Sequence, residues 1–423
     1  MAVIKTERES WLKRIVGAFI CMGLGFGMFL AAFPLLFLNE GRAVETAAAQ
    51  AEAEEVCLSV PSNENVAPEN EGRLIHLSGT TATDDVLTDD VFGIKLNGIR
   101  LVREVQFYQW QEHKEKHTEK NLGGSTTTTT TYTYRKAWVH RPIPSDDFQE
   151  EGHRNCVAMP GIDEEKHVAE HVRYGAFRLS PQQIKRIGGD SRELRLEDMQ
   201  MATEISDMFT SLTKGEEVKH HDNMKGYVLE AYEIPEHLRS RAERRGNELY
   251  IHRIPGDYPE AMEAAPEIGD MRVTWKFVGP QVPVSVIAVQ YRDTFTPYHA
   301  KSSSRAIDIV RDGEWSAESM FADARRNNEM LTWLLRLAGA ALMFIGLLLL
   351  LRPLEVLADV LPFLGNIVGV VNALAAFMIA VILSLVTIAA AWVFYRPVLA
   401  CCLLALAAAV TVWYMRYRKA QQA

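Results

Sequence analysis

The segment His167-Val168-Ala169-Glu170-His171 is the first candidate for catalysis, because its HxxEH spacing matches a known zinc-peptidase motif. On a helix this spacing would place the two imidazoles one turn apart as zinc ligands, with Glu170 as the general base. The pattern is short, and zinc chemistry also needs a third ligand and a cleft. Charged residues at 163–166 and Arg173 favour an exposed charged helix instead. We therefore predict no metal site, with a zinc-dependent membrane hydrolase on His167 and His171 as an alternative.

The five cysteines divide between the apolar and the polar parts of the chain. Cys21, Cys401 and Cys402 lie in apolar segments, whereas Cys57 and Cys156 lie in the polar middle. In an oxidising compartment these last two could form one disulfide, and both a bridge and two free thiols stay open. The chain has no phosphate-binding glycine loop, nucleophile elbow or dinucleotide fingerprint, so we expect no enzymatic activity and no cofactor.

The distribution of apolar residues identifies the class of protein. The chain has 423 residues, 48% of them hydrophobic and 23% charged, and the apolar residues gather at 15–38 and 331–414. Such blocks exclude a purely soluble enzyme and a disordered chain. The formal net charge is -9, and both ends are basic, so the acidic residues gather in the middle. Phosphate contacts need clustered Lys and Arg, so nucleic acid is not expected as a partner.

Four segments are long and apolar enough to cross a bilayer. We predict four transmembrane helices, one N-terminal and three C-terminal, at 15–38, 331–351, 368–394 and 398–415. The basic ends, 1–14 and 416–423, belong in the cytoplasm by the positive-inside rule. Residues 39–330 would then form one extracytoplasmic domain, periplasmic or luminal. Between the second and third spans, 352–367 is expected to be a short interfacial helix or a tight loop.

The domain at 39–330 is predicted to be α+β and rich in strands, in one lobe or two. β-branched and aromatic residues, several of them alternating with polar ones, predict strands at 73–78, 99–110, 126–139, 174–179, 248–253 and 271–291. Helices are expected after Ser180, at 236–245, and from Ser316 directly into the second span. The threonine run at 126–131 is expected to be a solvated hairpin arm, with a partner-binding edge as the alternative.

The third and fourth predicted spans contain hydroxyls, one Asn and two cysteines as their polar side chains, and the second has Arg336 near its start. Ion and proton pathways usually need ionisable groups inside the membrane. We therefore interpret the spans as structural, with an ion channel or channel regulator as an alternative.

Motifs lie at the membrane junctions, at 39–42 after the first span, at 333 and 336 in the second, and at 395–397 before the fourth. They resemble those of the LUMA family, eukaryotic inner-nuclear-membrane proteins with bacterial relatives. They recur in order along nearly the whole chain, together with 66–74, 108–110, 132–134 with Trp138, and 269–273. The resemblance implies one span, a large luminal domain and three further spans, in a membrane organiser that self-associates and has no catalytic residues. The junction residues are Asn39, Glu40, Gly41, Arg42, Trp333, Arg336, Tyr395, Arg396 and Pro397.

These junction residues would act either as anchors at the headgroup level or as partner-binding groups, and the sequence favours neither. The overall prediction is a non-enzymatic multi-pass scaffold that organises membrane or envelope complexes by self-association. Its expected partners are the lipid bilayer, further copies of itself and unidentified envelope membrane proteins. The expected location is the bacterial inner membrane with both termini cytoplasmic or, in a eukaryote, the endoplasmic reticulum and inner nuclear membrane.

Overall fold

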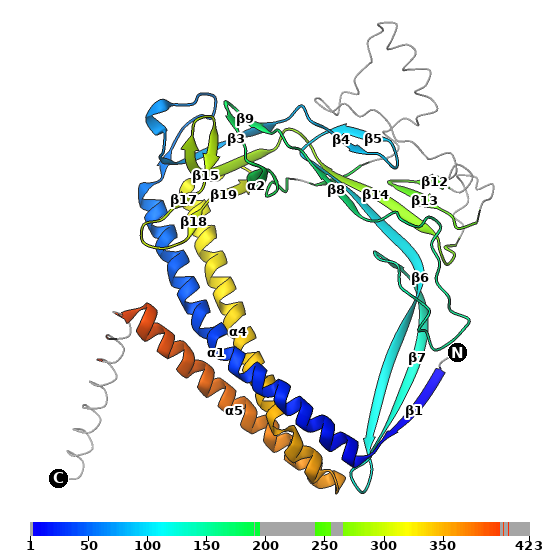
Figure 1. Cartoon of the computed structure of the whole chain (residues 1–423). Helices are drawn as coiled ribbons and strands as arrows, with labels where there is room; N and C mark the ends of the chain where they lie inside the picture. The colour runs from blue at the N-terminus through cyan, green and yellow to red at the C-terminus, as the bar shows by residue number, and fades with distance from the viewer. Residues whose placement is uncertain are drawn as a thin grey trace, which may run out of the picture.

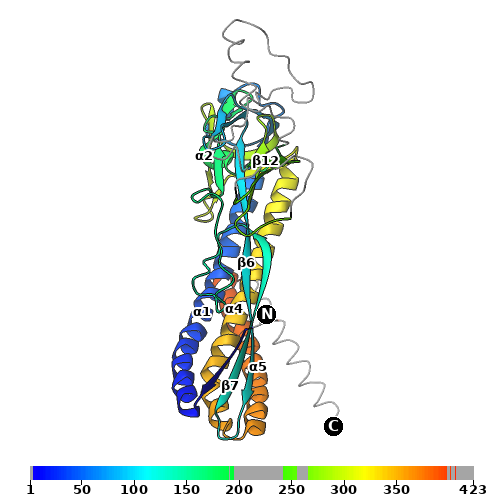
Figure 2. The same ribbon diagram turned by 90° about the vertical axis from the view of Figure 1, so that its right-hand side faces the viewer.

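The computed structural model describes residues 3–189, 191–194, 242–254 and 265–397, together with the single residues 401 and 405. Three long helices carry a head made of two sheets, and a long β-hairpin runs from the head back to the far end of the helices (Figure 1). The molecule is narrow when turned by 90°, so helices, head and hairpin form a flat, closed frame (Figure 2).

The three helices are α1 (Trp11–Val56), α4 (Ala317–Ala358) and α5 (Pro362–Tyr395). Ser10 caps α1 by accepting a hydrogen bond from the backbone of Lys13, and Ser316 caps α4 in the same way. Each helix contains an apolar stretch long enough to cross a membrane. The predicted run from Ser316 directly into the second span is confirmed, because α4 continues without a break from the head into its apolar part.

Small residues let α1 and α4 approach closely along their antiparallel contact. A Cβ atom added at Gly346 would lie 2.7 Å from the backbone nitrogen of Phe29, and one added at Gly25 would lie 2.7 Å from the carbonyl oxygen of Gly346. Glycine at such positions allows membrane helices to pack backbone against backbone. Next to this contact, Leu36 and Ala380 belong to a buried cluster shared by all three helices.

The segment 352–367, expected to be a short interfacial helix or a tight loop, is divided between the ends of two helices and a short turn. Helix α4 continues through Pro353 to Ala358, and α5 begins at Pro362 after a three-residue turn. The side chain of Asp359 in that turn is completely buried and paired with two cations, which holds the end of α4 in place. The predicted fourth helix at 398–415 lies outside the described residues, apart from positions 401 and 405.

The head consists of two main sheets around one core. The larger sheet has the order β1 (Val3–Glu9), β7 (Thr126–Val139), β6 (Arg100–Lys120), β14 (Met271–Val278), β13 (Glu248–Ile251) and β12 (Ala242–Arg245), with β8 (Glu165–Val168) on β6 and β11 (Arg192–Glu193) on β14. The second sheet has the order β19 (Ile309–Asp312), β15 (Pro283–Tyr291), β16 (Thr294–Thr296), β10 (Phe177–Arg178), β9 (Arg173–Tyr174), β3 (Leu74–Ala82) and β2 (Leu58–Ser59). Two small sheets pair β4 (Val86–Asp89) with β5 (Ile94–Asn97), and β17 (Tyr298–His299) with β18 (Ala306–Ile307).

Alternation along the strands builds the core of the head. Met271, Val273 and Trp275 of β14 are buried, and they share one cluster with Leu77 of β3. The indole of Trp275 donates a hydrogen bond of 2.8 Å to Asp89, which is also paired with Arg103 at 2.6 Å. This satisfies the buried polar groups inside an otherwise apolar core.

The second sheet also fixes the head to the helices. Ile287 of β15 points away from the main core into a second cluster, which contains Ala49 and Ala53 of α1 together with Met320 and Phe321 of α4. The aqueous ends of α1 and α4 are therefore part of the head.

The predicted strand-rich α+β domain is confirmed in its strands, whereas its helices differ from the prediction. The helix after Ser180 is the single turn α2 (Pro181–Ile184), in which Ser180 and Gln183 form a capping box. Of the helix predicted at 236–245, residues Ala242–Arg245 form strand β12 instead, and the preceding residues lie outside the described part. A short 3-10 helix, Pro68–Asn70, joins β2 to β3.

The hairpin that closes the frame is made by β6 and β7, and β1 adds a third strand to it. We call β1, residues 111–120 of β6 and residues 126–134 of β7 the arm. Thr6 of β1 lies opposite Thr129, which in turn lies opposite His117. The predicted topology put residues 1–14 across the membrane from residues 39–330, and the structure does not support this division, because residues 3–9 pair with 126–132 in one sheet.

Candidate functional site

A buried carboxylate, that of Glu40, joins the three helices near the head. Arg336 of α4 binds it in a bidentate manner, with Nε 2.6 Å from Oε1 and Nη2 2.8 Å from Oε2. From α5, Trp392 donates its indole N–H to Oε2 at 2.8 Å. Glu40 is fully buried, so all three of these hydrogen bonds form away from water. Charge-assisted, bidentate contacts of this kind are the strongest that side chains make.

Aromatic rings surround the guanidinium of Arg336. Its Cζ lies 4.7 Å from the centre of the Trp333 ring and 5.9 Å from that of Trp392. The guanidinium lies over both rings, and the negative π-face of an indole attracts a cation.

A second set of hydrogen bonds extends this junction towards the head. Asn39 donates to the carbonyl of Thr332 at 3.1 Å, and Arg42 donates to Thr332 Oγ1 at 2.8 Å and to Asn328 Oδ1 at 2.9 Å. Asn328 in turn donates to the carbonyl of Ala43 at 3.0 Å. Each polar side chain from one helix therefore has a partner on the other.

Gly41 makes room for the end of α5. A Cβ atom at Gly41 would lie 2.6 Å from the ring of Tyr395, so any larger residue would displace that ring. Arg396 is the C-cap residue of α5, and its backbone N–H donates to the carbonyl of Trp392 at 2.8 Å. Pro397 is exposed just beyond.

The structure thus brings most of the predicted junction residues together. Asn39, Glu40, Gly41 and Arg42 of α1 meet Arg336 of α4, with Trp333 and Tyr395 packed beside them. Sequence reasoning missed Trp392 and Asn328 as members. The spacing offered a signal for the first, because Trp392 lies one helical turn before Tyr395 and so shares a face with it. We call this group the helix junction, and its carboxylate accepts hydrogen bonds from three donors.

A second ionic group lies at the opposite end of the helices, which we call the tip cluster. Asp359 is fully buried and lies 2.8 Å from Lys120 at the end of β6, while Arg14 of α1 also binds it. Lys120 is also 2.9 Å from Glu355. Burial lowers the pKa of Lys120, but the two carboxylates outweigh burial and raise it above its usual value.

Backbone contacts complete the attachment of the hairpin tip. The indole of Trp11 donates to the carbonyl of Val356 at 2.9 Å, and the N–H of Gly123 donates to the carbonyl of Val360 at 3.0 Å. Gly124 has φ +79° and lies against the Trp11 ring, where a Cβ atom would come within 2.3 Å of it. The tip of the hairpin is thus bound to the N-terminal end of α1 and to the turn between α4 and α5.

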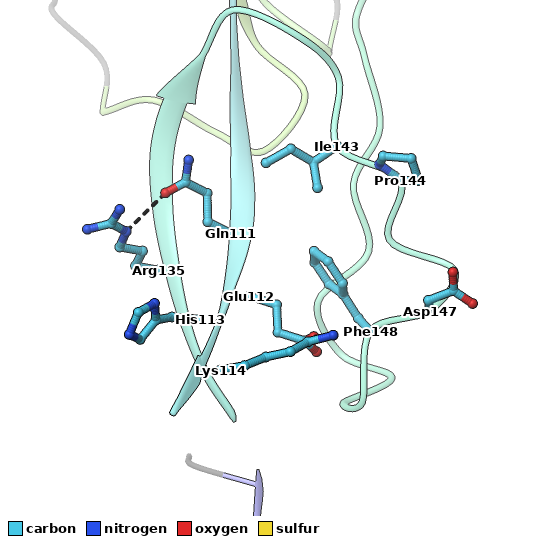
Figure 3. Close-up of a pocket in the computed structure, with 9 residues that line it drawn as sticks. All are labelled: Gln111, Glu112, His113, Lys114, Arg135, Ile143, Pro144, Asp147 and Phe148. Carbon is cyan, nitrogen blue, oxygen red and sulfur yellow. Dashed lines mark hydrogen bonds and ion pairs between the residues drawn. The ribbon is translucent and has the colours of Figure 1, made fainter. Parts of the chain in front are cut away.

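A groove of about 390 Å³ lies between the arm and the loop that follows β7 (Figure 3). At its base Glu112 accepts hydrogen bonds from Tyr134 at 2.7 Å and from the backbone of Gln149 at 2.9 Å. Burial raises the pKa of Glu112, but these donors and Lys114 outweigh it, so the pKa lies below its usual value. Burial and the Glu112 carboxylate raise the pKa of Tyr134 to about 12. The residues that line the groove are Gln111, Glu112, His113, Lys114, Arg135, Ile143, Pro144, Asp147 and Phe148.

The zinc-hydrolase interpretation of the HxxEH segment is wrong. Residues Glu165–Val168 form strand β8, which pairs with β6, so the helix that would bring His167 and His171 together is absent there. His167 lies 3.4 Å from Glu165, whereas His171 lies 3.3 Å from Asp85. Among the described residues no group of three potential ligands is placed to hold a metal ion.

The possible disulfide is not formed. Cys57 and Cys156 are both free thiols, and they lie in different surroundings. Cys57 packs against the cluster that joins the helices to the head, where burial and Glu54 raise its pKa to about 11. Cys156 instead lies beside Arg253, with its Sγ 3.7 Å from Nη1.

Three membrane-length helices, a strand-rich head and two buried ionic groups define an integral membrane protein in which polar side chains serve to join elements. Comparison with known proteins gives its family. The family model described as "Transmembrane protein 43" matches residues 107–397. The chain is 33% identical to human transmembrane protein 43 over 405 residues, which is 93% of this chain and 89% of the human one. It therefore belongs to the transmembrane protein 43 family, which is the LUMA family.

Other similar proteins belong to the same family. The mouse protein has the same 33% identity, and the Drosophila melanogaster homolog is 29% identical over 428 residues, covering 97% of this chain and 96% of its own. No solved structure matches the chain. These relatives come from animals, so they do not support the bacterial inner membrane that we expected.

Proposed function

We propose that this protein is a non-enzymatic membrane scaffold that assembles with further copies of itself and with other membrane proteins. The observation that carries the proposal is the closed frame. The helix junction joins the helices near the head, and the tip cluster joins them at the opposite end and binds the arm there. In both groups the charged side chains are occupied by one another. Such an arrangement holds the frame in one shape.

The outer surface of the helices supports the same proposal. Large apolar side chains of α5 point outwards, including Phe363, Val370, Leu374 and Phe394, each more than 60% exposed. In a bilayer this face meets lipid or another helix. The frame therefore offers an apolar face within the membrane and a polar head outside it, and we expect both to bind other proteins.

The compartment belongs to the proposal as well. Because the relatives are animal proteins and the LUMA resemblance points to the nuclear envelope, we propose the endoplasmic reticulum and the inner nuclear membrane as its location. Fluorescence microscopy of the tagged full-length chain, with selective permeabilisation of the plasma membrane, tests this. Signal confined to the cell surface would contradict it.

Crosslinking in native membranes, followed by affinity capture and mass spectrometry, tests the scaffold. We expect links between copies of the chain at a constant ratio to the monomer over a tenfold range of expression. A second multi-pass protein expressed at the same level is the control for random encounters. A chain that stays monomeric, with no partner above that control, would refute the proposal.

One observation favours the channel alternative. The arm is polar on both faces of β6, and it runs from the head to the far end of the apolar helices, which it meets at its tip (Figure 1). If several arms were enclosed by helices, they would line a polar path. Ion flux through reconstituted vesicles tests this function, and flux no higher than that of empty vesicles would exclude it.

A further inference from the structure

Among the described residues, the arm has two edges that pair with no further strand. At Trp110 the edge of β6 is closed by Asn155, which accepts from the Trp110 N–H at 2.7 Å and donates to its carbonyl at 2.9 Å. Beyond that point, residues 111–120 pair only with β7 within the described part of the chain. On the other side of β7, β1 ends the sheet. Open edges of this length are templates for further strand pairing.

The position of the arm makes these open edges costly. Its tip contacts Arg14 and Asp359, at the end of the helices opposite to the helix junction. About 26 residues of α1 separate Arg14 from Glu40, or roughly 39 Å, which matches the thickness of a bilayer with its headgroups. Lipid cannot satisfy unpaired N–H and C=O groups at this depth. Some polar structure must therefore cover the edges.

The side chains of the two edges carry opposite charges on each face of the sheet. Successive residues of a strand point to opposite faces, and the register gives the residues that share one. On one face, β1 presents mainly carboxylates and β6 presents ammonium groups, whereas on the other face the signs are reversed. Lys5 of β1 and Glu112 of β6 are the two exceptions on the first face. Each pairs within its own strand, Lys5 with Glu7 at 3.7 Å and Glu112 with Lys114 at 3.1 Å. The first face holds Glu7 and Glu9 against Lys114 and Lys116, and the second holds Arg8 against Glu115 and Glu119.

We propose that β1 of one copy pairs with the open edge of β6 in a neighbouring copy, so that the arms of several copies form one continuous sheet. Both strands are antiparallel to β7, so they run parallel to each other. Copies related by rotation about the membrane normal would thus join parallel edges of opposite charge. Such a head-to-tail contact closes into a ring or continues as a chain, and it does not stop at a dimer. The inference rests on the proposed self-association and names its surface.

Engineered disulfides test the contact in native membranes. In a variant without the five native cysteines, Glu7→Cys is combined with Lys114→Cys, Lys116→Cys or Thr118→Cys, all on the first face. Within one copy β7 separates the two positions by two strand spacings, about 9.6 Å, which is too far for a disulfide. We expect mild oxidation to give a ladder of covalent multimers for at least one of these pairs. Glu7→Cys with His117→Cys, which points to the opposite face, should give at least fivefold less.

Two further variants make the result decisive. Thr6→Cys with Thr129→Cys, directly opposite within one copy, should form an intrachain disulfide and so report that the arm has formed. Reversal of charge in Glu7→Lys with Glu9→Lys should weaken the ladder, and adding Lys114→Glu with Lys116→Glu should restore it. An intrachain bridge without any ladder would overturn the inference, as would the absence of the intrachain bridge.

The outcomes also separate this inference from the proposed function. If ordinary crosslinking still links copies of the chain while no ladder forms, the scaffold stands and the pairing of edges is wrong. If the chain is monomeric in both experiments, both proposals fail.

Discussion

Replacement of Arg336 by methionine should destabilise the helix junction strongly. The substitution removes two charge-assisted hydrogen bonds, of 2.6 and 2.8 Å, and leaves the fully buried Glu40 with the indole of Trp392 as its remaining donor. Breaking a buried ion pair by removing one partner costs about 3–5 kcal/mol, because the remaining charge is uncompensated. We expect a loss of this size in the free energy of unfolding.

A double-mutant cycle measured by SDS-induced unfolding in mixed micelles checks this magnitude. Glu40→Met combined with Arg336→Met should recover most of the loss, because no buried charge then remains unpaired. Arg326→Gln on the same helix is the matched control. The Arg326 side chain is 74% exposed, and its partner Asp323 keeps Arg311, so the loss should be less than about 1 kcal/mol. If Arg336→Met costs no more than Arg326→Gln, the junction is hydrated and our reasoning about it fails.

Three other changes have defined outcomes. Gly346→Val should force α1 and α4 apart and lower the free energy of unfolding by about 1–3 kcal/mol. Gly17→Val is the control, because Gly17 has open space around it and its replacement should have no such effect. Equal effects of the two substitutions in SDS titration would contradict the close contact. Cys57, whose pKa is about 11, should react with iodoacetamide far more slowly at pH 8 than glutathione does, and should match it after denaturation. Because the pKa of Glu112 is lowered, its hydrogen bond from Tyr134 should persist at neutral pH and be lost as the pH falls through the lowered pKa. Proteolysis of the 140–155 loop should then become faster. Glu112→Gln should abolish this pH dependence.

The sequence pattern was enough to predict elements whose buried or lipid-facing side is marked by apolar residues. The apolar runs gave three spans, and the β-branched and aromatic residues of 271–291 predicted the strand structure that β14 and β15 form. The arm shows where such reasoning ends. Residues 111–120 are polar at every position, so no face is marked and neither the length of the strand nor its direction follows from the sequence.

The candidate sites also differ in how far the sequence could predict them. Glu40 and Arg336 were singled out as motifs, but their pairing joins residues nearly three hundred positions apart, which only the antiparallel contact of α1 and α4 determines. The HxxEH segment gave the opposite error. Its spacing has chemical meaning only on a helix, and pairing of β8 with β6 overrides the local charge pattern that suggested one.

Helices α1 and α4 pass from the apolar region into the head as unbroken rods, with no hinge between them and the sheets. With 46 residues, α1 is about 69 Å long, and its last turns are part of the buried cluster of the head. The pair therefore works as a stiff lever. A tilt of the helices by 10°, within the range that bilayers of different thickness impose, would move the far end of α1 sideways by about 12 Å. Membrane thickness and the position of the head are thereby mechanically coupled.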